Sequence, residues 1–265
     1  MIKRGKKKII SVILTAALVF TTVFGAGFAY AGSSVSGFTG TTYTHNSRFN
    51  DRILIHGVDV STYQNGIDWN DAKAAGVDFA IIRIGFRGYG EAGRMQPDDW
   101  FVRNIEAAKA AGVMVGVYFF SQALNTFEAR AEADYTLELL GDYELDLPIF
   151  MDYEFSPVSS GRFTSGTITK IQATANVRAF CEYIEANGHR AGLYANLNFL
   201  NKTVDGEALG REYPIWVAQY YKTCNYDYDY DYWQYSSGGS VNGIGGRADV
   251  NFLYLPKESK RVSDK

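Results

Sequence analysis

From residue 53 onward, short apolar runs alternate with segments that have the residue spacing of amphipathic helices. The first four runs are residues 53–60, 79–85, 113–121 and 148–155, and helices are expected at 68–76, 98–111, 126–140 and 167–187. Near-continuous apolar strands joined by helices indicate a parallel sheet that is buried on both faces. Four more runs, at 191–196, 214–220, 230–236 and 249–255, have connections with little helical pattern.

Eight strands in a stretch of about 200 residues predict an α/β fold: an irregular, single-domain, TIM-like β/α barrel with fewer helices in its second half. An open, doubly wound sheet is the alternative architecture. That alternative is disfavoured because no glycine-rich phosphate loop follows the first apolar run.

The first 31 residues have the pattern of a secretory signal peptide. Five basic residues between Lys3 and Lys8 precede an apolar run from Ile9 to Phe28, and Ala29-Tyr-Ala31 has the small-x-small pattern of a cleavage site. An uncleaved membrane anchor is the alternative, because the apolar run is nearly long enough to span a bilayer. Residues 32–51 are rich in Gly, Ser and Thr, which predicts a flexible leader. The expected barrel spans 52–256, and a charged tail follows at 257–265.

Removal of the signal leaves 21 basic against 29 acidic residues, a formal net charge of −8. This balance gives no basic patch for nucleic acid or for an anionic membrane. The three histidines make no metal-ligand spacing, so neither a metal nor another cofactor is expected. Cys181 falls within an apolar helical pattern, which favours a buried free thiol over a disulfide with Cys224.

Two carboxylates lie one residue apart in the fourth run, at Asp152 and Glu154. Because strand side chains alternate between faces, both acids are expected on one face, with Cα atoms about 6.5–7 Å apart. Repulsion between such neighbours raises the pKa of the less solvated acid and leaves the other ionised. Glycoside cleavage uses this division of roles, although an ordinary solvent-facing strand end would have the same pattern.

Other polar and aromatic residues follow the expected strands at the end where barrel enzymes place their catalytic groups. Asp59 and Asp249 are the strongest of these candidates, because an aspartate within an apolar strand is costly without a partner or a role. Aromatic rings and amides around one mouth suit a carbohydrate. Each residue also has a structural alternative, such as charge neutralisation for an arginine or core packing for a tryptophan. The candidate substrate-binding residues are Tyr63, Arg83, Tyr118, Tyr194, Trp216, Gln219 and Gln234.

An ordered series of segments resembles the Chalaropsis-type lysozymes, glycoside hydrolase family 25, which are peptidoglycan muramidases. The series covers residues 53–255 and consists of Gly57-Val-Asp-Val-Ser61, Gln64-Asn-Gly-Ile-Asp-Trp69, Ile82-Arg-Ile-Gly85, Val115-Gly-Val-Tyr-Phe-Phe-Ser121, Pro148-Ile-Phe-Met-Asp-Tyr-Glu154, Tyr213-Pro-Ile-Trp-Val-Ala-Gln-Tyr220, Trp233-Gln-Tyr235 and Asp249-Val-Asn251. The resemblance implies that Glu154 is the catalytic acid, that Asp152 supports it, and that Asp59 and Asp249 flank the pocket. The chain departs from the family pattern at Phe119, where many members have His, and at Phe199, where many have Trp.

The resemblance implies a secreted, cell-wall-associated lysozyme that hydrolyses the β-1,4 bond between N-acetylmuramic acid and N-acetylglucosamine. We expect a monomer that acts on peptidoglycan glycan strands, without a nucleic acid partner and without membrane contact after signal removal. A chitinase-like carbohydrase and a non-catalytic glycan-binding protein are the alternatives. The spacing of Asp152 and Glu154 leaves the stereochemical course open, and we favour retention with help from the substrate's acetamido group.

Overall fold

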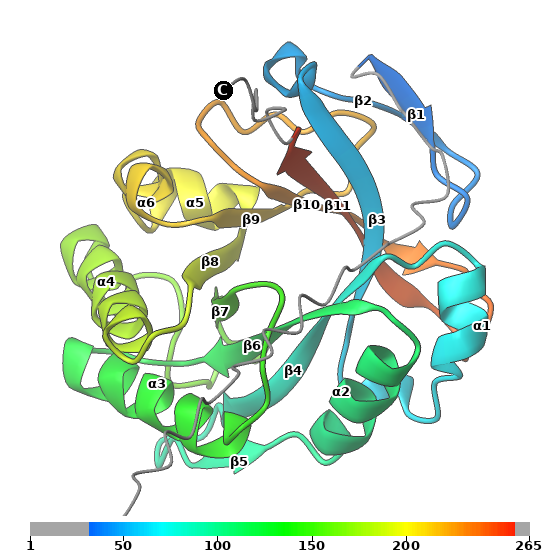
Figure 1. The fold of residues 1–265 in the computed structure, drawn as a ribbon. Helices are drawn as coiled ribbons and strands as arrows, with labels where there is room; N and C mark the ends of the chain where they lie inside the picture. Colours follow the sequence, from blue (N-terminus) through cyan, green and yellow to red (C-terminus); the bar gives the residue numbers. More distant parts are fainter. Residues whose placement is uncertain (1–31, 258–265) are drawn as a thin grey trace, which may run out of the picture.

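A closed barrel of eight strands forms the body of the molecule (Figure 1). The computed structural model describes residues 32–257, so the expected signal peptide and nearly all of the expected charged tail lie outside the described residues. Hydrogen-bonded neighbours follow the order β3-β11-β10-β9-β8-β7-β6-β4, and pairing of β3 with β4 closes the ring. The barrel strands are β3 (Arg52–Val60), β4 (Phe79–Arg87), β6 (Met114–Ser121), β7 (Ile149–Tyr153), β8 (Ala191–Asn196), β9 (Ile215–Ala218), β10 (Tyr232–Gly239) and β11 (Ala248–Pro256). The predicted β/α barrel is therefore confirmed.

Helices surround the barrel unevenly, and the first four connections between barrel strands carry those predicted from sequence (Figure 1). These helices are α1 (Trp69–Ala74), α2 (Phe101–Ala110), α3 (Thr126–Leu140) and α4 (Lys170–Ala186). The second half has only the short helices α5 (Leu197–Lys202) and α6 (Gly206–Glu212). The first half also has a short strand, β5 (Met95–Pro97), on the edge of β4 and a single turn, η2 (Thr62–Gln64), and another single turn, η1 (Ser47–Phe49), precedes the barrel. Within the described part of the chain, no helix is long and apolar enough to cross a membrane.

The sheet is not wholly parallel, which corrects the expectation from sequence. The seven barrel strands other than β11 run parallel to one another, but β11 is antiparallel to both of its neighbours, β10 and β3. The connection from Gly239 to Ala248 is too short for the crossover of a dozen or more residues that a parallel pair needs. The start of β11 therefore lies beside the ends of the parallel strands.

Two buried layers follow from the alternation of side chains along each strand. In β7, Ile149, Met151 and Tyr153 face the helices, whereas Phe150 faces the barrel interior. The interior is tightly filled, since a Cβ atom added at Gly57 would lie 2.5 Å from the ring of Phe79. The outer layer also holds the two cysteines, 181 and 224, both as buried free thiols.

Residues 32–51 do not form the flexible leader expected from their composition. They contain a hairpin of β1 (Ser33–Val35) and β2 (Thr42–Thr44), followed by the turn η1. Tyr43 packs edge-on against Trp233 and Phe252, and Phe49 stacks on Tyr254 at 3.7 Å between ring centroids. The hairpin thus covers the outer face of β10 and β11, where the connections supply no helix (Figure 1). Its aromatic residues supply the buried surface that its small polar residues lack.

Candidate active site

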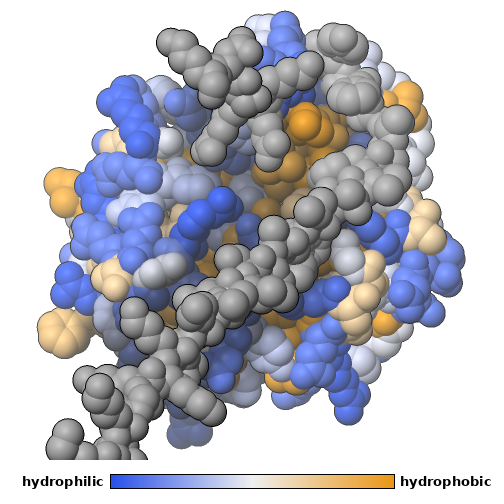
Figure 2. Space-filling view, viewed as in Figure 1, coloured by the Kyte–Doolittle hydropathy of each residue, from blue (hydrophilic) through white to orange (hydrophobic). Residues whose placement is uncertain are grey.

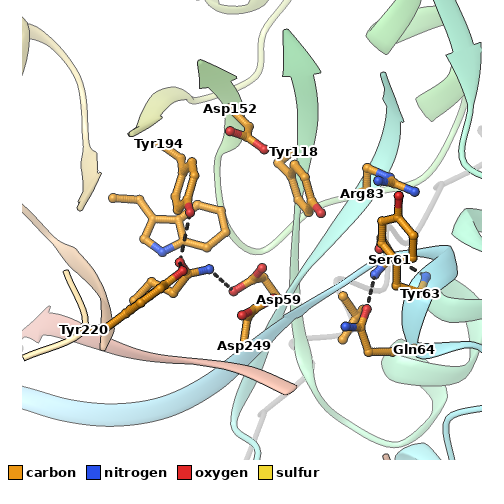
Figure 3. Close-up of a pocket in the computed structure, with 13 residues that line it drawn as sticks. Asp59, Ser61, Tyr63, Gln64, Arg83, Tyr118, Asp152, Tyr194, Tyr220 and Asp249 are labelled. Atoms are coloured by element: carbon orange, nitrogen blue, oxygen red, sulfur yellow. Dashed lines mark hydrogen bonds between the residues drawn. The ribbon is translucent and has the colours of Figure 1, made fainter. Parts of the chain in front are cut away.

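A pocket of about 210 Å³ opens at the carboxyl ends of the parallel strands (Figure 3). Nine of the eleven residues proposed from sequence line it; Glu154 and Gln219 are the exceptions. Glu154 lies beside the pocket, one residue beyond the end of β7, and is close enough to act electrostatically on Asp152 and Asp59. Gln219 instead supports the fold, because its side-chain oxygen accepts a hydrogen bond from the Asn225 N–H at 2.7 Å.

Asp59 and Asp249 lie directly opposite each other on β3 and β11. The antiparallel direction of β11 produces this pairing, because it brings the beginning of that strand to the pocket. Burial, and secondarily the charge of Asp249, raise the pKa of Asp59 well above its usual range. Burial also raises the pKa of Asp249, to about 6.

Two side-chain amides hold the Asp59 carboxyl group in place. Gln234 Nε2 and Asn251 Nδ2 both donate to Asp59 Oδ2, each at 2.8 Å. Each amide is oriented in turn: Trp216 Nε1 donates to Asn251 Oδ1 at 2.8 Å, and the Tyr194 hydroxyl donates to Gln234 Oε1 at 2.9 Å. The sequence-based site set omitted Asn251, although its position two residues after an aspartate of the same strand places both on one face.

Asp152 and Glu154 come from the end of β7. Asp152 is 6% exposed, and its Oδ1 has no hydrogen-bond partner among the described residues. Burial first, and then the charges of Glu154 and Asp59, raise the pKa of Asp152 well above its usual range, while Arg83 opposes the increase. Burial likewise raises the pKa of Glu154, with Asp249 adding to the increase and Tyr194 opposing it. All four neighbouring acids therefore have raised pKa values, and because they interact, the protonation of one affects that of the others.

Arg83 lines the pocket but forms its ion pair outside the group of four acids. Its Nε donates to Asp98 Oδ2 at 2.7 Å, and the guanidinium lies 5.2 Å from the centroids of both the Tyr63 and Phe86 rings. Asp98 also accepts the backbone N–H of Thr62 at 3.0 Å. The pair thus fixes the loop after β3, whereas the sequence had indicated Asp98 only as a helix-terminal residue.

Tyrosine side chains line the pocket at different depths (Figure 3). Tyr63 is 80% exposed and Tyr220 is 53% exposed, whereas Tyr194 is 8% exposed and packs on Trp216 at 4.4 Å between ring centroids. Trp216 is buried and acts as the floor of the pocket and as a donor to Asn251. Exposed rings of this kind stack on the apolar faces of sugars. On the face shown in Figure 2, hydrophilic residues cover most of the visible surface and hydrophobic residues form small groups.

The two departures from the resembled family lie away from the pocket. Phe119 is buried on the outer side of β6, where it contacts Tyr135, and Phe199 packs against Tyr153 and Phe163. Within the described residues, no group of three or more histidine, cysteine or acidic side chains is arranged to hold a metal ion. The arrangement supports acid–base chemistry by carboxyl groups.

Comparison with known proteins places these residues in one family. The sequence model of "Glycosyl hydrolases family 25" matches residues 58–244. An autolytic lysozyme of Clostridium acetobutylicum is 30% identical over 200 residues, which are 74% of this chain and 54% of that protein. Lysozyme M1 of Streptomyces globisporus is 29% identical over 74% of this chain and 67% of its own length. The crystal structure of a bacterial lysozyme from Streptomyces coelicolor superposes with a TM-score of 0.62 at 27% identity, covering 74% of this chain and 90% of that one. This chain therefore spans about half the length of the Clostridium relative.

Proposed function

Because the chain belongs to glycosyl hydrolases family 25, we propose that it is a secreted lysozyme that cleaves peptidoglycan. The bond cleaved is the β-1,4 bond between N-acetylmuramic acid and N-acetylglucosamine. The observation that carries this proposal is the group of four carboxyl groups with raised pKa values around one pocket, of which Asp59 and Asp152 are buried and the other two are half-buried. A protein that only bound glycans would gain nothing from acids held so close together, because their mutual repulsion costs free energy.

Glu154 is the general acid in this proposal. Its raised pKa favours the protonated form, and that proton passes to the glycosidic oxygen as the bond to the anomeric carbon breaks. The leaving sugar departs as a neutral alcohol. Glu154, now ionised, then removes a proton from the water molecule that attacks the anomeric carbon in the second step.

Asp152 supports the reaction from the same strand face. In the substrate-assisted route, the acetamido oxygen of the muramic acid attacks the anomeric carbon and forms a cyclic cation. Oδ1 of Asp152, which has no hydrogen-bond partner among the described residues, would accept the acetamido N–H and stabilise that positive charge, and Arg83 favours the ionised form that this role needs. Water then opens the ring with overall retention, and no covalent ester forms on the enzyme.

The substrate class follows from the pocket and from the N-terminal sequence. Exposed tyrosine rings suit the sugar faces of glycan strands, and the signal-like first 31 residues would send the protein to the compartment of the cell wall. We propose that it acts there as a monomer.

Substitution of the general acid tests the proposal. Glu154→Gln preserves the shape of the side chain but removes its transferable proton, a loss of about 10²–10⁴-fold in turnover on purified peptidoglycan. Glu144→Gln is the matched control, since Glu144 is an exposed glutamate in the loop that precedes β7, at the opposite end of that strand. Near wild-type turnover by Glu154→Gln would refute the assignment.

A second substrate separates the competing functions. Release of reducing ends from chitin at a rate similar to that from peptidoglycan would favour the chitinase-like alternative. Binding to peptidoglycan without any release of reducing ends would favour the glycan-binding alternative.

A further inference from the structure

The catalytic glutamate of the proposed mechanism lies outside the strand that carries it. Strand pairing of β7 ends at Tyr153 on the side of β6 and at Asp152 on the side of β8. The backbone carbonyl of Glu154 instead accepts a hydrogen bond from the side-chain amide of Gln122, at 2.8 Å. At Glu154, a hydrogen bond from a side chain therefore takes the place of the backbone hydrogen bonds that a strand residue would make within the sheet.

Gln122 is fully buried, and its amide joins two chain segments. The same Nε2 that donates to Glu154 also donates to the carbonyl of Ser121, at 2.9 Å. Ser121 is the last residue of β6, so the amide fixes the end of β7 relative to the end of β6. Gln122 does not line the pocket and is 0% exposed, so its amide would act on the reaction through Glu154 and not by touching a substrate.

A buried ion pair between Glu132 and Arg87 holds residues 121 and 122 at the end of β6. Glu132 of α3 accepts the Ser121 hydroxyl at 2.5 Å and the backbone N–H of Gln122 at 3.3 Å. Arg87, the last residue of β4, donates to the same carboxylate at 2.6 Å, and the Glu132 side chain is 0% exposed. A buried pair of this kind contributes little net stability compared with apolar packing, whereas loss of one partner is strongly destabilising, so the pair constrains the position of the groups that it contacts.

Tyr153 provides a second attachment to the same loop. Its hydroxyl donates to the carbonyl of Ala123 at 2.5 Å, and Asn176 Nδ2 donates to the same carbonyl at 3.2 Å. The residues on both sides of the peptide bond between Tyr153 and Glu154 are thus held by residues 121–123.

We propose that Gln122 is a positioning residue for the reaction and that the Glu132–Arg87 pair holds it in place. Through its bond to the carbonyl of Glu154, Gln122 sets where the carboxyl group of that glutamate meets the glycosidic oxygen. This inference rests on the proposed role of Glu154 as the general acid. A misplacement of about 1 Å at such a group lowers turnover by about 10²-fold.

The test is Gln122→Met, which preserves length and volume but cannot donate a hydrogen bond. We expect kcat on a soluble tetrasaccharide of alternating N-acetylglucosamine and N-acetylmuramic acid to fall about 10–100-fold with KM nearly unchanged. The pH profile of kcat should also shift, because the carboxyl group of Glu154 would sit in a different environment. Asn104→Leu is the matched control: it removes the side-chain amide of a buried residue on α2 that does not line the pocket, and it should lower the melting temperature while leaving kcat unchanged.

The outcomes separate this inference from the function on which it rests. If Gln122→Met has wild-type kcat and pH profile while Glu154→Gln is inactive, the positioning role is wrong and the proposed acid stands. If Glu154→Gln is active, the proposed acid itself is wrong. If Gln122→Met does not fold, Ser121→Ala replaces it, since it removes the 2.5 Å bond to Glu132. That variant should lose at least threefold in kcat by the same reasoning, and an unchanged kcat would overturn the proposal.

Discussion

His45 makes the stability of the N-terminal hairpin dependent on pH. The imidazole is 6% exposed, with Nε2 at 2.7 Å from the Ser34 hydroxyl and Nδ1 at 2.8 Å from the Tyr254 hydroxyl. Burial first, and then the neighbouring His56, lower the pKa of His45 from 6.5 to about 4. Its charged form is therefore strongly disfavoured in the folded protein.

The sign of the effect follows from proton binding. Above pH 6.5 His45 is neutral in both the folded and the unfolded chain. As the pH falls from 6.5 towards 4, the unfolded chain takes up a proton that the folded chain does not, so the free energy of unfolding decreases. The difference between 6.5 and about 4 corresponds to about 3 kcal/mol at full effect.

The measurement is urea unfolding at pH 7.5 and pH 4.5, compared between the wild type and His45→Gln. The buried acids of the pocket, such as Asp59, have raised pKa values and stabilise the folded chain as the pH falls, so only the difference between variants isolates His45. We expect His45→Gln to lose about 2–3 kcal/mol less than the wild type between the two pH values. His189→Gln is the control, because it removes a histidine outside the hairpin. Equal pH dependence in the wild type and His45→Gln would refute the reasoning.

Three further substitutions test the pocket. Asp249→Asn should lower kcat/KM on peptidoglycan at least tenfold at an unchanged melting temperature, because it removes a charge that raises the pKa of Asp59; unchanged activity would make Asp249 a structural residue. Asn251→Leu should lower the free energy of unfolding by about 1–3 kcal/mol in urea titrations, because Trp216 Nε1 loses its acceptor; unaltered stability would contradict that role. Tyr63→Ala should raise KM with kcat nearly unchanged if its exposed ring stacks on the sugar, and a loss confined to kcat would exclude that role.

The eight barrel strands were predictable because each is a short apolar run bounded by turn residues. The direction of β11 could not be predicted in the same way, because its pattern of apolar residues is the same whether the strand runs parallel or antiparallel to its neighbours. The signal was the short link after Gly239, which a parallel crossover could not span. That strand's direction also explains Asp249, which lies at the start of its strand and still reaches the pocket.

The hairpin of residues 33–44 is not evident from the composition of its segment, which is rich in Gly, Ser and Thr; the signal was the position of single aromatic residues. Phe38, Tyr43 and Phe49 are spaced through the Gly, Ser and Thr of residues 32–51, and each is buried. Gln219 does not line the pocket, and the alternation rule cannot distinguish a pocket residue from a residue that contacts a loop. The proposed role of Gln122 could not be predicted from a sequence motif, because it depends on a contact with Glu154, which lies 32 positions further along the chain.

The central claim is tested most directly by the first product released from purified peptidoglycan. Reduction of the new ends and mass spectrometry identify the sugar that was cleaved, and NMR during the first minutes identifies its anomer. A retaining muramidase should release new reducing ends that are N-acetylmuramic acid and appear first as the β anomer. New ends of N-acetylglucosamine, an initial α anomer, or a sugar covalently bound to Asp152 would contradict it.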